Sequence, residues 1–156
     1  MTSLFSEKIV PYHGIDTITL GMTLSEVRNY LKNNKIPFNQ AMESNKECTP
    51  PIPWISITVD DSLSMSFVKD VLFEISFEGK YAGTLPNGVG VGMSMKELED
   101  IDDTLKYDDD DEMFVSENGY WIIDDIDSGK VKTITIFLED VNSDDFFDYE
   151  WVNKYL

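Results

Sequence analysis

His13 and Cys48 are the one histidine and the one cysteine of the chain, and a thiol paired with an imidazole is a possible catalytic arrangement. The pair acts only if both side chains meet in space. His13 lies in a segment before the first predicted helix, whereas Cys48 lies in a proline-bearing loop. Nothing in the sequence brings these segments together, so we predict no thiol chemistry.

Carboxylates are the other abundant reactive groups. The runs at residues 108–112 and 124–127 could bind calcium, but neither has the alternating oxygen ligands, central glycine and final glutamate of a calcium loop. No spacing among the thirty acidic residues selects a catalytic pair of the glycosidase type. Residues 79–92 are glycine-rich but lack phosphate-loop spacing and are interpreted as a linker. We therefore predict no enzyme activity, no metal and no cofactor.

The chain is strongly acidic, with twelve basic and thirty acidic residues and a formal net charge of −18. Residues 1–78 hold ten of the acids and six of the bases, so most of the excess lies in residues 79–156. Such a field repels nucleic acid and anionic lipid and attracts basic partners. We expect no direct binding to nucleic acid or membranes, although solubility alone is a second interpretation of the charge.

A single cysteine excludes an internal disulfide, as is typical of a reducing compartment. Charged residues and a proline interrupt the first twenty residues, so no apolar core of a signal peptide is present. No later stretch has the length of a membrane span. The sequence predicts a cytoplasmic monomer that forms a heterodimer with its partner.

Hydrophobic periodicity predicts an N-terminal segment (1–13) and a first unit (14–78). The expected elements of this unit are a strand over 15–20, a helix over 24–34, a loop over 38–53, and an antiparallel meander of strands over 54–59, 63–68 and 71–78. Alternation places Val71, Phe73, Ile75 and Phe77 on an apolar face, and Leu72 and Glu74 on the opposite, polar face. A helix is expected on the apolar face.

A second unit (79–140) repeats this order, with a helix over 95–105 and strands over 113–116, 120–124 and 131–139. Within the last strand, Ile134 and Ile136 are predicted to face the core, and Phe137 to face outward. The C-terminal residues 141–156 are predicted to form a closing helix, because Phe147, Trp151 and Tyr155 recur at four-residue steps.

A repeated octapeptide marks the start of both helices: LGMTLSEV at residues 20–27 and VGMSMKEL at residues 91–98. Thr23 and Ser94 stand at the N-cap position, each followed three residues later by a glutamate that can complete a capping box. Self-similarity at a fixed offset is the signature of repeat architecture. We expect an α+β fold of two tandem, pseudo-symmetric repeats, each a short strand and capped helix packed on an antiparallel meander, joined into one curved sheet.

This arrangement, given twice over residues 14–140, resembles the β-lactamase inhibitor protein and the related single-copy lipoproteins of the SmpA/OmlA type. The resemblance implies that the two sheets form a curved surface that grips and blocks another protein. Those proteins are secreted and disulfide-bonded, or lipidated on an N-terminal cysteine, whereas this chain has neither feature. An acidic cytoplasmic protein with such a scaffold suggests a bacterial immunity protein that neutralises a cognate toxin, with a basic nuclease as the expected target.

The predicted contact surface combines the acidic runs with two aromatic residues expected to face outward among serine and threonine. Its members are Trp54, Tyr107, Asp108, Asp109, Asp110, Asp111, Glu112, Asp124, Asp125, Asp127 and Phe137. Burial of Trp54 and Phe137 under the other unit or the C-terminal segment is the alternative for those two residues. Two other functions stay open: a small enzyme or ligand-binding domain that uses the cleft between the repeats, and an acidic DNA mimic.

Overall fold

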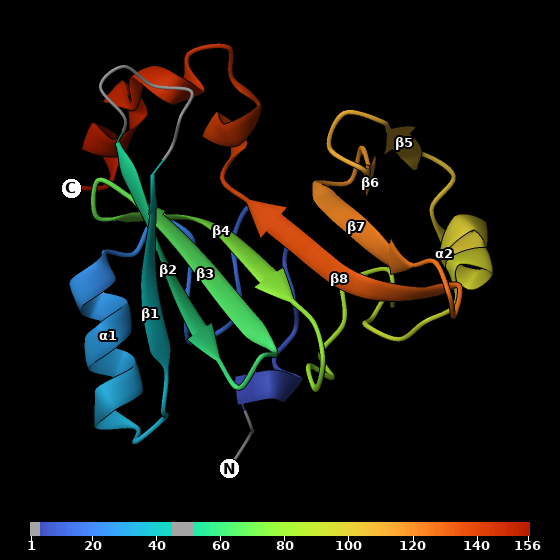
Figure 1. The fold of residues 1–156 in the computed structure, drawn as a ribbon, viewed down its shortest axis with the longest axis horizontal. Coiled ribbons are helices and arrows are strands. Elements are labelled where there is room, and N and C mark those ends of the chain that lie inside the picture. Colours follow the sequence, from blue (N-terminus) through green and yellow to red (C-terminus); the bar gives the residue numbers. More distant parts are fainter. Residues whose placement is uncertain (1–3, 45–51) are drawn as a thin grey trace.

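The computed structural model describes residues 4–44 and 52–156. They form an α+β fold in which eight strands make one antiparallel sheet in the order β1-β2-β3-β4-β8-β7-β6-β5 (Figure 1). The two four-strand sections meet where β4 pairs with β8. The elements are η1 (Leu4–Ser6), α1 (Leu24–Asn33), β1 (Asn39–Ser44), β2 (Pro53–Val59), β3 (Leu63–Val68), β4 (Val71–Phe77), α2 (Met95–Ile101), β5 (Lys106–Asp108), β6 (Met113–Val115), β7 (Tyr120–Asp125), β8 (Lys130–Phe137), η2 (Glu139–Asn142), η3 (Phe146–Asp148) and η4 (Glu150–Lys154).

Both helices begin at the predicted caps. The Thr23 hydroxyl accepts a hydrogen bond from the Glu26 N–H at 3.2 Å, and the Glu26 carboxylate accepts one from the Thr23 N–H at 3.1 Å. The Ser94 hydroxyl likewise accepts from the Glu97 N–H at 3.1 Å. The helix starts are therefore confirmed, and the reciprocal capping box is formed at α1.

Replacing Thr23 by alanine should lower the free energy of unfolding by about 1 kcal/mol, because it removes the hydroxyl that accepts from the Glu26 N–H. Ser94→Ala should cost a similar amount, because the Ser94 hydroxyl likewise accepts one bond, from the Glu97 N–H. Urea unfolding measures both values, with Ser25→Ala at an exposed helical position as the control. A loss below about 0.3 kcal/mol for either variant would contradict the assignment of that hydroxyl as a helix cap.

Each helix is tied to the last strand of its own section by matching backbone hydrogen bonds. These bonds run from Gly21 N to Leu72 O (2.8 Å), from Leu72 N to Met22 O (2.9 Å), from Gly92 N to Val131 O (2.8 Å), and from Val131 N to Met93 O (2.7 Å). Gly21 and Gly92 have φ values of +96° and +89°, which glycine adopts without a side-chain clash. The two Gly-Met dipeptides therefore place the helix caps against β4 and β8.

The main core lies between one face of the sheet and the segments that cover it. Val27 and Leu31 of α1 and Leu98 of α2 are fully buried there. Ile15 and Ile18 join them, but the predicted strand over 15–20 is wrong, because the Ile15 N–H donates to the Ile18 carbonyl and closes a turn. Apolar residues of a buried turn gave the same alternation as a short strand.

A β-bulge in β4 overturns the predicted faces of three residues. Ser66 pairs with Glu74 and Phe67 with Leu72, so Phe73 is the extra residue between them. Leu72 therefore packs in the main core, whereas Val71 and Phe73 join a second cluster on the opposite face. A bulge interrupts the period of two on which the prediction depended.

Two predicted boundaries also differ. The expected loop over 38–53 contains β1, an edge strand whose described side chains are exposed and so show no apolar alternation. Residues 45–51 of that expected loop, Cys48 among them, lie outside the described part of the chain. Helix α2 ends at Ile101 because Asp102 has an extended backbone and its carboxylate accepts from the Thr104 N–H at 3.0 Å, an Asx turn that competes with the helix.

The residues after β8 form three short 3-10 helices instead of the predicted single helix. Tyr149 has a φ of +57°, which separates η3 from η4. Phe146, Tyr149 and Trp151 are buried, whereas Phe147 is 41% exposed. The C-terminal segment (139–156) packs on the sheet face opposite the helices, where it covers Phe73 and Val71.

Candidate functional site

The sheet face opposite the helices carries a hollow of about 550 Å³. Its floor comes from β4 and β8, and its sides come from the C-terminal segment and from β6, β7 and the turn before β6. In Figure 1 the C-terminal segment (red) lies at the upper left and the strands β5 and β6 at the upper right, with the end of β8 between them. This hollow has the size of a typical binding site and combines aromatic walls with polar groups.

The floor is polar because the two sections of the sheet pair there. Antiparallel pairing sets Ser76 of β4 opposite Thr135 of β8, and their hydroxyl oxygens are 2.9 Å apart. Thr133 donates from Oγ1 to Glu78 Oε2 at 3.2 Å. Each hydroxyl still has acceptor capacity toward a ligand.

Glu74 is the charged residue of the floor. No described residue donates a hydrogen bond to its carboxylate or forms an ion pair with it. Burial raises the pKa of Glu74 from 4.5 to about 7. Asp111, on the turn before β6, is the other acidic residue that lines the hollow. The site therefore contains a carboxyl group that changes its charge near neutral pH.

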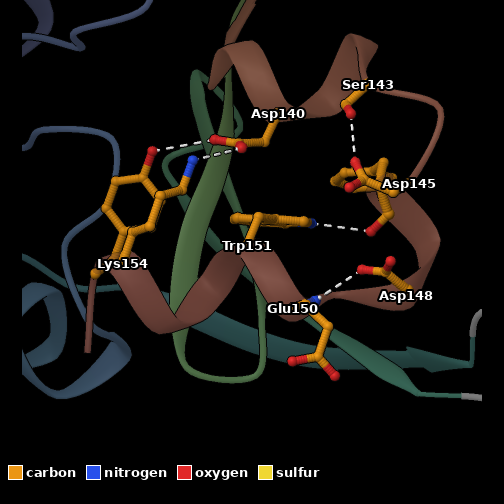
Figure 2. Close-up of polar contacts among 9 residues, drawn as sticks. Asp140, Ser143, Asp145, Asp148, Glu150, Trp151 and Lys154 are labelled. Atoms are coloured by element: carbon orange, nitrogen blue, oxygen red, sulfur yellow. Dashed lines mark hydrogen bonds and ion pairs between the residues drawn. The ribbon is translucent and has the colours of Figure 1, made fainter.

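The C-terminal wall is fixed by its own hydrogen bonds, as Figure 2 shows. The Asp140 carboxylate forms an ion pair with Lys154 at 2.7 Å and accepts from the Tyr155 hydroxyl at 3.1 Å. The Trp151 indole N–H donates to the Phe146 carbonyl at 2.9 Å, and the two rings stack with an interplanar angle of 15°. These contacts hold Phe146 in place beside the hollow.

Trp54 connects this wall to β2. Its indole N–H donates to the Tyr149 hydroxyl at 2.9 Å, and its ring packs edge-on against Phe73 at 4.9 Å between centroids. Across the hollow, Trp121 of β7 stacks on Phe137 at 4.2 Å. Both indole rings are therefore held in defined positions before any partner binds.

Two residues of the predicted contact surface, Trp54 and Asp111, line this hollow. Phe137 does not offer an exposed ring. It is 1% exposed, stacked on Trp121 and met edge-on by Tyr12 at 5.8 Å. Its predicted outward, accessible position is therefore corrected, because other aromatic residues cover the side of β8 on which it lies.

The acidic stretch before β6 has both a structural and an exposed part. The Asp108 carboxylate accepts from the N–H groups of Asp110 and Asp111 at 2.9 and 3.3 Å and so closes the turn. Tyr107 is 51% exposed and packs edge-on against Phe114. The exposed carboxylates of the stretch belong to Asp109, Asp110, Asp111 and Glu112.

The remaining predicted residues lie elsewhere, in the β7–β8 turn. Asp125 accepts from the Asp127 N–H at 3.1 Å. Asp124, Asp125 and Asp127 line a separate depression of about 450 Å³ with Lys132. None of the three lines the hollow above β4 and β8.

Glu74, Trp121 and Phe147 line the hollow but were not among the predicted site residues. Glu74 had a detectable signal, because it is the one charged residue within the apolar sequence VLFEISF of β4. Burying a carboxylate in an apolar strand costs free energy unless the carboxylate is paired or hydrogen-bonded. Trp121 and Phe147 gave no such signal, since they reach the hollow only through the pairing of β7 with β8 and the packing of the C-terminal segment on the sheet.

A second buried acid, Asp102, has the opposite environment. It is 3% exposed and accepts hydrogen bonds from Ser116 Oγ at 2.5 Å, Thr104 Oγ1 at 2.6 Å, Asn118 Nδ2 at 3.1 Å and the Tyr120 hydroxyl. Burial alone would raise the pKa of Asp102, but these donors outweigh it and hold the pKa far below the usual range. Its acceptor sites are occupied, so we assign Asp102 to the structure rather than to chemistry.

Within residues 4–44 and 52–156, no three His, Cys, Asp or Glu side chains are grouped so that they could hold a metal ion. The described helices include none that is long and apolar enough to cross a membrane. His13 is exposed, and its backbone N–H and carbonyl are bonded within the turn before α1.

The hollow therefore combines two fixed indole rings, a floor of hydroxyl groups set by strand pairing, and two carboxyl groups. No protein-family model, no curated protein and no solved structure matches this chain.

Proposed function

We propose that this chain is a non-catalytic, cytoplasmic inhibitor of the immunity-protein kind, which forms a heterodimer with a basic protein toxin and covers its active surface. The observation that carries the proposal is the hollow above β4 and β8, where fixed aromatic rings surround an unpaired carboxyl group. A nuclease-type toxin suits the charge, because enzymes that bind nucleic acid present basic surfaces.

Charge supports a role in encounter. The carboxylates of Asp109, Asp110 and Glu112 are exposed on the turn whose neighbour Asp111 borders the hollow. The formal net charge of the chain is −18. Exposed charges steer a partner over about a Debye length, roughly 8 Å at physiological salt.

Aromatic side chains support a role in retention. Trp54 and Phe147 border the hollow on one side and Trp121 on the other. Trp54 is fixed by its bond to Tyr149 and Trp121 by stacking on Phe137. Rigid aromatic anchors in a partly enclosed site are typical of binding hot spots, and little freedom is lost when they bind.

We further propose that the two sections of the sheet are tandem, pseudo-symmetric repeats. Three features support this: the recurring octapeptide, the matching bonds of Gly21 and Gly92, and the isolated bridges that join Thr23 to Val71 and Ser94 to Lys130 at the starts of β4 and β8. In this arrangement the hollow lies at the junction of the repeats. The inhibitory surface would then depend on the duplication itself.

The test is to capture the partner from the native host with the tagged protein, identify it by mass, and measure its binding kinetics. The double variant Asp109→Asn with Asp110→Asn should slow association at low salt about threefold or more and leave dissociation within about twofold, because exposed charges act mainly on encounter. The two residues make no side-chain hydrogen bond in the described structure, so the turn should stay intact.

Glu99→Gln with Asp100→Asn is the matched control, since it removes the same charge from exposed positions on α2. It should slow association less than the variant beside the hollow. Equal effects of the two variants, or none from either, would show that the acidic residues serve solubility. A captured partner whose activity is undiminished by the bound protein would contradict inhibition.

A further inference from the structure

We propose that the hollow above β4 and β8 is a receptor for one arginine side chain of the partner, with Glu74 as its counter-ion. The inference rests on the proposed function in one respect, namely that the partner is a basic protein. It adds the residue that the partner must present and the group that recognises it.

The charged groups that line the hollow are all acidic. Glu74 lies on its floor without a hydrogen-bond donor or a cation among the described residues, and Asp111 adds a second carboxylate at the side. No residue that lines the hollow is basic. A partly buried carboxylate without a partner is costly, and a cation brought by a ligand removes that cost.

The surroundings favour arginine over lysine. The rings of Trp54, Trp121 and Phe147 line the hollow, and a planar guanidinium stacks on aromatic faces. The hydroxyls of Ser76 and Thr135 lie on the same floor as Glu74. They offer several acceptors to the five N–H donors of a guanidinium, whereas a lysine ammonium is a compact point charge.

Binding of arginine should also change the protonation of Glu74. Burial keeps a proton on this carboxyl group up to about pH 7, and a cation beside it favours the ionised form. Among the residues that line the hollow from β2, β4, β6, β7, β8 and the C-terminal segment, no other is titratable except Asp111 on the turn before β6. Proton release near pH 7 should therefore accompany binding and should come from Glu74.

The test uses three short probes with blocked ends: glycine-arginine-glycine, glycine-lysine-glycine, and glycine-citrulline-glycine, in which citrulline is the neutral isostere of arginine. NMR follows the indole N–H signals of Trp54 and Trp121 and the carboxyl carbon signal of Glu74. The arginine probe should shift all three signals with a dissociation constant in the millimolar range and lower the pKa of Glu74. The lysine probe should bind at least about threefold more weakly, and the citrulline probe at least about tenfold more weakly.

Glu74→Gln should weaken the arginine probe at least about tenfold, whereas Glu99→Gln, which removes the same charge from α2, should have little effect. Equal binding of arginine and citrulline, equal binding of arginine and lysine, or an unchanged affinity in Glu74→Gln would overturn the proposal. So would the absence of any shift at about 20 mM probe, well above the expected millimolar constant.

These outcomes separate the arginine site from the proposed function. An arginine probe that binds at Glu74, in a protein that captures no toxin, would retain the site and reject inhibition. A captured toxin that binds the wild-type protein and Glu74→Gln equally well would retain inhibition and reject the site.

Discussion

Glu74→Gln should make the protein more stable above pH 7, by about 2 kcal/mol in the free energy of unfolding. In the folded protein burial raises the pKa of Glu74 from 4.5 to about 7. One pKa unit corresponds to about 1.4 kcal/mol, so ionisation of Glu74 costs the wild-type protein up to about 3 kcal/mol. A glutamine amide without hydrogen-bond partners also costs free energy when it is buried, so the expected stabilisation is smaller than this value.

The sign follows from proton binding. Between pH 4.5 and pH 7 the folded protein holds a proton on Glu74 that the unfolded chain has lost, so stability falls as pH rises through this window. Asp111 is the other charged group that lines the hollow. Below about pH 4.5 both states are protonated and the contribution of Glu74 is fully retained.

Urea unfolding from pH 4 to pH 8 measures this effect. The difference between Glu74→Gln and the wild-type protein should grow with pH, whereas Glu99→Gln, on the exposed side of α2, should follow the wild-type curve at a nearly constant offset. A constant offset for both variants would show that Glu74 ionises normally. A group that lowers stability at working pH is typical of a binding residue kept at the expense of the fold.

The features that could be predicted from the sequence depend on near neighbours. The helix caps at Thr23 and Ser94 follow from a hydroxyl three residues before a glutamate. Strands β2, β3 and β4 follow from alternation, and Asp60-Asp61 and Lys69-Asp70 form the expected turns with positive φ. Each of these features is decided within about ten residues of chain.

The features that could not be predicted depend on distant contacts. The bulge at Phe73 is visible only in the pairing of β4 with β3, and it changes the predicted face of Val71, Leu72 and Phe73. Strand β1 is exposed and polar, so only its hydrogen bonds to β2 define it. The C-terminal residues pack against Trp54 and Phe73, and these contacts, rather than helical periodicity, set their conformation.

The candidate site divides in the same way. Trp54 and Asp111 could be chosen from composition and charge, and both line the hollow. Glu74 joins them because β4 pairs with β8, a contact between residues about sixty positions apart that no local pattern indicates. Phe137 looked equally suitable in sequence, but Trp121 and Tyr12 cover it.

Asp102→Asn should have the opposite effect on stability and a larger one, a loss of about 3 kcal/mol in the free energy of unfolding at pH 7. The carboxylate accepts hydrogen bonds from Ser116, Thr104, Asn118 and Tyr120 in a buried position. The NH2 group of asparagine is itself a donor, so it would face hydroxyl and amide donors in place of an accepting oxygen and leave buried hydroxyls without an acceptor. The bonds join the end of α2 to the turn before β7, so the loss falls on the packing of α2 against the sheet.

The dependence on pH distinguishes this loss from simple damage to packing. Because the pKa of Asp102 is lowered on folding, the unfolded chain takes up a proton first as pH falls, and the stability that Asp102 supplies is lost below its unfolded value of 3.8. The gap between wild type and Asp102→Asn, measured by urea unfolding, should therefore be full at pH 7 and should shrink below about pH 4. Asp103→Asn, at the exposed neighbouring position, should keep the wild-type stability within about 0.5 kcal/mol. A gap between Asp102→Asn and wild type that is the same at pH 3 and pH 7 would mean that the ionised carboxylate is not what the hydrogen bonds stabilise.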